Sequence, residues 1–200
     1  MTDPNGRTNL FQHKQPNDYY PWLAACLVMA TAITTLWAMG RVWWCEAGDL
    51  VPWSWDIWSR HNSQHLIDPY LFTHILHGVF EFWILGLIFP KMPLAWRLVI
   101  AIAIESTWEV GENTDTVIQR YREATLSLDY YGDSILNSLA DIIACAGGFM
   151  IAYRLKFWRS LALFLLTELA LIVTIRDSLI LNVIMLIYPV EAIKQWQMGG

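Results

Sequence analysis

Apolar runs of about twenty residues recur along this chain, and they constrain its fold more than any other feature. The first run, residues 21–40, carries no charged side chain and is long enough to cross a hydrocarbon core of about 30 Å as a helix. Backbone groups inside a bilayer must form their hydrogen bonds within the protein, so apolar runs of this length fold as helices. The sequence therefore predicts an all-α fold, a polytopic transmembrane helix bundle.

The composition agrees with a membrane protein and excludes one class of partner. Of the residues in this chain, 56% are hydrophobic and 16% are charged, whereas about a quarter of the residues in a soluble domain are charged. Its net charge of −5 leaves no basic stripe that could neutralise phosphates, which excludes nucleic acid. The expected partners are membrane lipids and a polar ligand such as a lipid headgroup or a cell-wall precursor. The oligomeric state stays open.

About six membrane spans are expected, one for each long apolar run. Residues 1–20 form a polar, flexible tail rich in Asn, Gln and Pro, and residues 21–197 form a single transmembrane helical domain. A hairpin between the last two spans is favoured, although one bent helix over residues 157–193 stays open. The expected spans are residues 21–40, 70–89, 94–110, 133–153, 157–175 and 178–193.

The basic residues predict how the bundle lies in the membrane. With both termini in the cytoplasm, eight Lys and Arg residues lie inside and five outside. The cluster at residues 154–159 is the strongest part of this bias. The loop at residues 45–69 carries Trp53, Trp55 and Trp58, which is typical of a segment at the level of the lipid headgroups.

Five carboxylates interrupt these apolar runs. Each costs roughly 2.5–3.5 kcal/mol on insertion scales, so together they would cost about 12–17 kcal/mol if unpaired. This equals or exceeds the stability of a typical domain, about 5–15 kcal/mol, so they need partners, water or protons. Glu168 stands alone on its span and is expected to be structural or protonated. The five are Glu81, Glu105, Glu109, Asp141 and Glu168.

Polar residues occur at helical spacing on three of the expected spans, so each set shares one helix face. At 1.5 Å per residue, the three faces reach a similar depth, roughly 6–12 Å below the outer surface. Their convergence predicts an outward-facing polar pocket, although the same groups could also serve only to hold helices together. The three sets are His74, His77 and Glu81; Glu105, Glu109 and Glu112; and Asp133, Asn137 and Asp141.

The expected pocket also includes arginines from the connecting segments. Their planar guanidinium groups suit phosphate or carboxylate groups of a ligand. The complete predicted set is His74, His77, Glu81, Glu105, Glu109, Arg120, Arg122, Asp133, Asn137, Asp141, Arg176 and Asp177.

Several kinds of chemistry fit this set. The favoured function is binding or processing of a polar envelope ligand, including a cation. An intramembrane enzyme is one alternative, with Glu109, His77 and Asp133 as candidate acid–base groups. A carrier coupled to ions is another. A divalent metal is a possible cofactor, with His74, His77, Glu109 and Asp133 as candidate ligands.

The three cysteines indicate neither a disulfide framework nor a metal knuckle, because their spacing is irregular. Cys26 and Cys145 lie in apolar runs and Cys45 lies at a helix end. All three are interpreted as small buried or interfacial apolar side chains.

Several strings of the sequence are specific enough to suggest a family. They resemble segments of an uncharacterised family of small multi-pass membrane proteins of alphaproteobacteria. The resemblance covers the chain from about residue 20 to its end and implies a multi-pass protein of the bacterial inner membrane. The strings include His74-Ile75-Leu76-His77-Gly78, Gln119-Arg120-Tyr121-Arg122-Glu123-Ala124-Thr125 and Asp129-Tyr130-Tyr131-Gly132-Asp133-Ser134.

A second pattern resembles VanZ-like membrane proteins, which are associated with glycopeptide resistance. These carry a Glu at a helix end, a basic loop, and an Asp and an Asn four residues apart before a Gly-rich helix. The chain departs from this pattern at Asp141 and at its His74 and His77 pair, so the resemblance implies a shared fold. The matching residues are Glu105 or Glu109, Arg120 or Arg122, Asp133, Asn137, Gly147 and Gly148.

Overall fold

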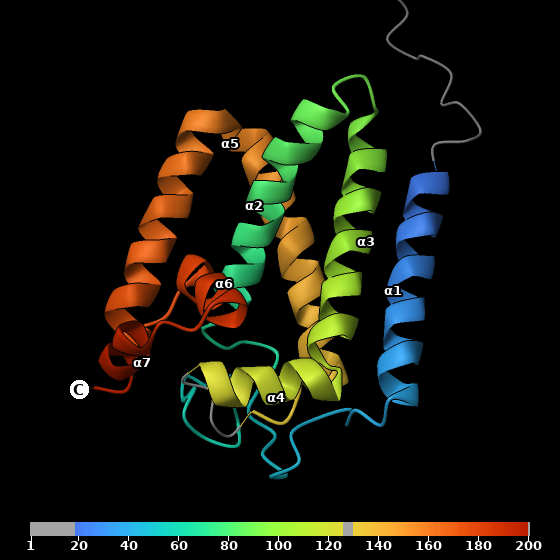
Figure 1. Cartoon of the computed structure of the whole chain (residues 1–200). Helices are drawn as coiled ribbons and strands as arrows, with labels where there is room; N and C mark the ends of the chain where they lie inside the picture. Colours follow the sequence, from blue (N-terminus) through green and yellow to red (C-terminus); the bar gives the residue numbers. More distant parts are fainter. Residues whose placement is uncertain (1–18, 126–129, 200) are drawn as a thin grey trace, which may run out of the picture.

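Long helices lie side by side in the computed structural model of the chain, which describes residues 19–125 and 130–199 (Figure 1). The predicted all-α class is confirmed for these residues. Residues 1–18 of the predicted polar tail lie outside the described residues. The helices are α1 (Tyr20–Ala38), α2 (Leu71–Ile88), α3 (Leu94–Glu112), α4 (Asp115–Ala124), α5 (Ile135–Ile175), α6 (Leu179–Ile187) and α7 (Glu191–Gln197).

Three of the described helices are long and apolar enough to cross a membrane: α1, α2 and α5. They indicate a membrane-associated protein. Helix α3 also has 19 residues, but it carries Arg97 and three glutamates, which lower its hydropathy. The number of predicted spans is therefore larger than the number that length and composition support.

Helix α5 has two arms that join at Lys156. The backbone of this residue has φ 61° and ψ 177°, outside the helical region, and the chain reverses there (Figure 1). The arms correspond to the fourth and fifth predicted spans. The second arm ends at Arg176, which adopts a left-handed conformation with φ 54°. A separate helix, α6, then begins, so residues 157–193 do not form one bent helix.

The predicted sixth span, residues 178–193, is wrong. Helix α6 has nine residues, so at about 1.5 Å per residue it measures roughly 14 Å and cannot cross a 30 Å core. Pro189 explains the early end, because it lacks an N–H group and disfavours helical backbone at Tyr188, whose φ is −138° and ψ is 92°. Helix α7 follows as a separate short helix.

Because α6 does not cross the bundle, the two described ends of the chain also lie elsewhere than predicted. Helix α1 begins at the upper end of the bundle in Figure 1, whereas α7 lies at the lower end, near α4 and α6. Both ends of the chain were expected on the cytoplasmic face. The structure instead puts the start of α1 and the end of α7 at opposite ends of the bundle.

Helices α2 and α5 approach each other closely through two glycines. A Cβ atom on Gly78 would overlap the carbonyl group of Cys145, and one on Gly148 would overlap that of Ile75. Gly147 has open space around its Cα, so it does not belong to this contact. The close approach brings the polar face of α2 against the start of α5.

Side-chain oxygens satisfy the first N–H groups of two helices. Ser134 Oγ accepts from the Asn137 N–H at the start of α5, 3.1 Å away. At the start of α6, the Glu168 carboxylate accepts from the N–H groups of Leu179 and Ile180, at 2.9 and 3.2 Å. Free N–H groups at a helix start favour a negative charge. Glu168 is therefore structural, one of the two expected possibilities.

Candidate polar cavity

A small polar cavity of about 50 Å³ lies where α2, α3 and the start of α5 meet, at the end of the bundle that holds α4 and α6. Such a volume admits only a few water molecules, since one needs roughly 10–15 Å³ of this kind of space. Trp108 closes part of the wall. The polar lining residues are Asn62, Ser63, Tyr70, Thr73, His74, His77, Glu112, Tyr121, Tyr130, Asp133, Asp141 and Asn182.

Glu105 of α3 holds both histidines of α2. Its Oε1 lies 2.5 Å from His74 Nδ1, and its Oε2 lies 2.9 Å from His77 Nδ1. His74 and His77 are one helical turn apart, so their rings reach the same carboxylate and pack edge to face, with centroids 5.1 Å apart. Each imidazole therefore carries its proton on Nδ1 toward Glu105, which leaves its other nitrogen to face the surroundings.

Two further carboxylates lie near His74, one beside the same ring nitrogen and one beside the other nitrogen. Its Nδ1 is 3.4 Å from Glu109 Oε1, and its Nε2 is 3.9 Å from Asp141 Oδ2. Both Glu109 oxygens and Asp141 Oδ1 are buried without a hydrogen-bond partner among the described residues. A buried carboxylate oxygen without a donor is costly, so these groups need a proton or a cation.

Asp133 lies at the outer wall of the cavity, just before α5 begins. Its Oδ2 accepts from Asn113 Nδ2 at 2.6 Å and its Oδ1 accepts from the Tyr130 hydroxyl at 3.0 Å. Burial raises the pKa of Asp133, although these two hydrogen bonds act in the opposite direction. Asn113 Oδ1 also accepts from the Asp133 N–H at 2.8 Å, so the two residues fix the geometry of this wall.

Asp177 lies between α5 and α6, away from the cavity lining. Its carboxylate accepts hydrogen bonds from the Tyr70 hydroxyl at 3.1 Å and from Gln197 Nε2 at 3.1 Å. Burial raises the pKa of Asp177 to about 6, against the effect of the hydrogen bonds that it accepts. It joins α7 to the loop before α2 and so supports the cavity without lining it.

Two further residues of the predicted set, Glu81 and Asn137, lie behind the cavity wall and do not line the cavity. Glu81 is further along α2, and its Oε2 lies 3.2 Å from the Cys145 thiol of α5. Asn137 Nδ2 donates to the His65 carbonyl oxygen at 2.8 Å, which joins α5 to the loop before α2. Both residues link helices or loops, which is the structural role that the sequence left open.

The structure does not bring the predicted arginines to the cavity. Arg120 donates to the Leu186 and Ile187 carbonyl oxygens at the end of α6, at 2.9 and 3.2 Å. The Arg122 guanidinium lies over the Tyr131 ring, 4.7 Å from its centroid. Arg176 Nη1 donates to the Trp196 carbonyl oxygen at 3.1 Å. Within the described part of the chain, no Lys or Arg side chain lines the cavity.

Several cavity residues carry no clear signal in the sequence. Trp108, Tyr121 and Tyr130 do not belong to the pattern of polar helix faces, and Asn62 and Ser63 lie in an irregular loop. The Tyr121 hydroxyl donates to Asn182 Oδ1 at 3.2 Å, so it joins α4 to α6. Such contacts depend on how the short helices fold back, which helical spacing alone does not reveal.

Two overlapping groups of side chains could hold a metal ion at this site. Within each group, one ligand atom per residue lies within 4.8 Å of the others. His74 belongs to both groups, which are His74, His77 and Glu105, and His74, Glu109 and Glu112.

Comparisons with known proteins give relatives but no activity. A family model described as a protein of unknown function, DUF2585, matches residues 36–199. The UPF0314 protein NGR_c32320 of Sinorhizobium fredii is 49% identical over 180 residues, covering 89% of this chain and 91% of the relative. The UPF0314 protein of Brucella anthropi is 43% identical over 195 residues, covering 96% and 99%. No solved structure matches the chain.

Proposed function

Because this chain belongs to the DUF2585 family of proteins of unknown function, its activity is inferred from its own cavity, and we propose that this cavity binds a divalent metal ion. The protein is proposed to be a multi-pass protein of the bacterial inner membrane. The family predicted from the sequence strings is the one that matches. The resemblance to VanZ-like proteins stays a prediction.

The imbalance of charge around the cavity carries this proposal. Five buried carboxylates surround the cavity, whereas the only basic side chains among its described lining residues are the imidazoles of His74 and His77. Buried carboxylates at such short distances cannot all ionise unless a cation or protons compensate their charge. The carboxylates around the cavity are Glu105, Glu109, Glu112, Asp133 and Asp141, and all of them are buried.

The size of the cavity favours an ion over a larger ligand. About 50 Å³ accommodates an ion with a few waters, whereas a lipid headgroup or a cell-wall precursor requires more room. Imidazole and carboxylate together suit Mn²⁺, Fe²⁺ or Zn²⁺. His74, Glu109 and Glu112 are the proposed ligands, since one ligand atom of each lies within 4.8 Å of the others, and Glu105 orients the His74 ring.

The cavity end of the bundle is proposed to face outward. The turn between the arms of α5, with Arg154, Lys156 and Arg159 around it, lies at the opposite end and suits the cytoplasmic face (Figure 1). Exposed tryptophans of the segment between α1 and α2, including Trp53 and Trp55, suit the outer headgroup level. A phosphatase reporter fused to the C-terminus is then active in the periplasm, and an inactive fusion would contradict this orientation.

A second hollow favours an anionic envelope ligand as a further candidate. It has a volume of about 120 Å³, is lined by Arg41, Arg60 and Glu46, and shares Asn62 and Asp133 with the cavity. Arg41 Nε is buried without a hydrogen-bond partner among the described residues. A phosphate or carboxylate bound there would lie beside the metal ion, which would allow metal-assisted processing of that ligand. Mass spectrometry of lipids that co-purify with wild type and with Arg60→Gln tests this candidate.

Metal analysis of gently extracted protein tests the main proposal. The wild type is expected to retain one equivalent of divalent metal more than Glu109→Gln retains. Glu123→Gln, an exposed carboxylate on α4, is the matched control and retains it. Equal metal content in the wild type and in Glu109→Gln, both as purified and after titration, would overturn the proposal.

A further inference from the structure

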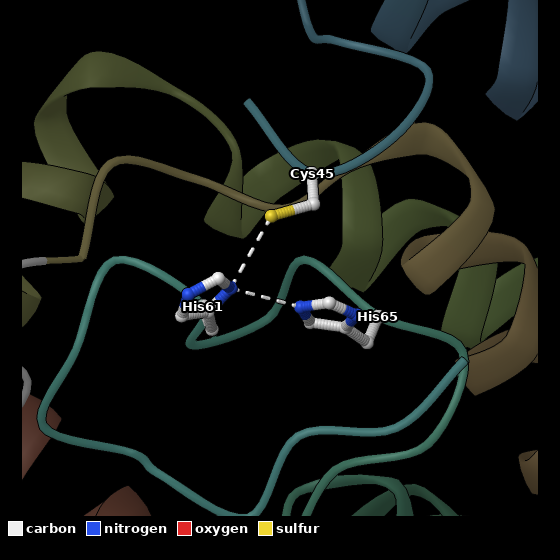
Figure 2. A group of neighbouring side chains, drawn as sticks. All are labelled: Cys45, His61 and His65. Atoms are coloured by element: carbon white, nitrogen blue, oxygen red, sulfur yellow. Dashed lines mark hydrogen bonds between the residues drawn. The ribbon is translucent and has the colours of Figure 1, made fainter. Parts of the chain in front are cut away.

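Three metal-ligating side chains meet outside the cavity, in the segment that connects α1 to α2. Figure 2 shows Cys45, His61 and His65 pointing toward one another. Cys45 Sγ lies 3.4 Å from His61 Nδ1, and that nitrogen lies 3.1 Å from His65 Nε2. Cys45 and His65 are buried, and His61 is half-buried. This arrangement shields the thiol while leaving one side accessible.

The spacing is close to that of a tetrahedral metal site. Zinc–sulfur bonds of about 2.3 Å and zinc–nitrogen bonds of about 2.0 Å place sulfur and nitrogen roughly 3.6 Å apart, and two nitrogens roughly 3.3 Å apart. The observed 3.4 and 3.1 Å differ from these values by a few tenths of an ångström. Ligation therefore needs only small side-chain movements.

The tautomer of His65 is fixed in the form that a metal requires. Its Nδ1 lies 2.5 Å from the Val51 carbonyl oxygen, which can only accept, so Nδ1 carries the proton. His65 Nε2 then presents a lone pair toward His61 and Cys45. Histidines that bind metals usually donate their other N–H to a carbonyl or a carboxylate in this way.

We propose that Cys45, His61 and His65 bind a d¹⁰ metal ion with affinity for thiolate, Zn²⁺ or Cu⁺. One sulfur and two imidazoles favour such ions over Mg²⁺, Ca²⁺ or Mn²⁺, which prefer oxygen ligands. The metal–sulfur bond replaces the S–H bond, and the proton leaves to solvent. Three protein ligands leave the fourth tetrahedral position for water or an external ligand.

The site would also fix one wall of the polar cavity. His61 and His65 flank Asn62 and Ser63, which line that cavity. Ser63 has a positive φ of 56°, which is unusual for a residue with a Cβ atom, so this turn is held by its surroundings. A metal that bridges His61 and His65 would close a loop of five residues around this turn.

Cobalt titration of the full-length protein, stripped of metal and reduced in detergent micelles, tests the proposal. Co²⁺ substitutes for Zn²⁺ and gives a thiolate-to-metal charge-transfer band when a cysteine ligates it. The wild type is expected to show this band at one equivalent, and Zn²⁺ or Cu⁺ displaces the cobalt. Cys45→Ser abolishes the band, and His65→Ala weakens binding at least tenfold. Cys26→Ser, an exposed thiol on α1, is the matched control and keeps the band.

Two results would overturn the proposal. One is a wild type without a cobalt–thiolate band, which requires no substituted protein and so does not depend on how a variant folds. The other is a band that persists in Cys45→Ser. His74→Ala should leave the band unchanged, so this experiment separates the Cys45 site from the metal proposed for the cavity.

Discussion

His74 Nδ1 and Glu105 Oε1 lie 2.5 Å apart and join α2 to α3 at the polar cavity. The same carboxylate accepts from His77, so one acidic group orients two imidazoles. Because Glu109 lies near the same nitrogen and Asp141 lies near Nε2 of the ring, three carboxylates surround a single imidazole. That concentration of charge explains why a cation is the ligand that we propose.

Replacing Glu105 tests how much this contact stabilises the bundle. Glu105→Gln removes the charge and leaves one amide oxygen for the N–H groups of the buried His74 and the half-buried His77. We expect a loss of about 1–3 kcal/mol in the free energy of unfolding, the usual cost of an unsatisfied buried donor. Tryptophan fluorescence during unfolding in detergent measures it. The exposed Glu123→Gln should remain within about 0.5 kcal/mol of wild type, and equal effects of the two would contradict this role.

The contact between α2 and α5 gives a second prediction. Gly148→Ala puts a methyl group against the Ile75 carbonyl, so the helices must separate, at a cost of about 1–3 kcal/mol. Gly147→Ala is the neighbouring control, because its side chain would meet open space. It should be neutral or stabilise by up to about 1 kcal/mol through helix propensity. Thermal unfolding of both variants checks the difference, and equal melting temperatures would refute the close packing.

The sequence predicts the polar faces well because helical spacing is a local property. His74, His77, Glu105 and Asp141 lie in long regular helices, so their shared faces follow from their positions in the chain. The structure brings these residues together, although their role as a ligand site stays a prediction. Glu168 caps the start of α6 through a contact between two helices. The sequence alone left two possibilities for Glu168, a structural role or a protonated carboxylate.

Features set by tertiary contacts are harder to predict. Arg120 has the charge that suits an anion site, but its guanidinium donates its hydrogen bonds to the carbonyl groups at the end of α6. The sixth apolar run suggests a span, but Pro189 divides it and the pieces fold back over the bundle end. Cys45 and His61 are sixteen residues apart in an irregular loop, and no periodic pattern reveals that they meet.

The turn within α5 gives a prediction about backbone strain. Lys156 has a φ of 61° and a ψ of 177°, a region that is nearly specific to glycine and costs about 1–3 kcal/mol for other residues. Lys156→Gly should therefore stabilise the protein by about 1 kcal/mol relative to Lys156→Ala. Both variants lose the same charge, so the comparison isolates the backbone. A lower free energy of unfolding for the glycine variant would contradict the strained turn.

Asp177 predicts a dependence of stability on pH. Its pKa is raised from 3.8 to about 6 in the folded protein by burial, so the folded state binds more protons than the unfolded state between these values. Its contribution to stability is therefore largest below pH 4 and falls as the pH rises through 6. Relative to Asp177→Asn, the wild type should lose about 2 kcal/mol between pH 4 and pH 7.5. Chemical unfolding of both proteins at the two pH values measures this, and a constant difference would contradict it.

A titration of the metal-free, full-length protein with Mn²⁺, followed by electron paramagnetic resonance of the free ion, tests the metal site in the polar cavity. Mn²⁺ prefers oxygen and imidazole ligands, so it reports on the cavity and not on the Cys45 site. We predict one bound Mn²⁺ per wild-type chain and unchanged binding in Cys45→Ser. The paired substitutions His74→Ala and Glu105→Gln should weaken binding at least a hundredfold. A wild type that binds no Mn²⁺, or paired substitutions that leave its affinity unchanged, would contradict a metal site in the polar cavity.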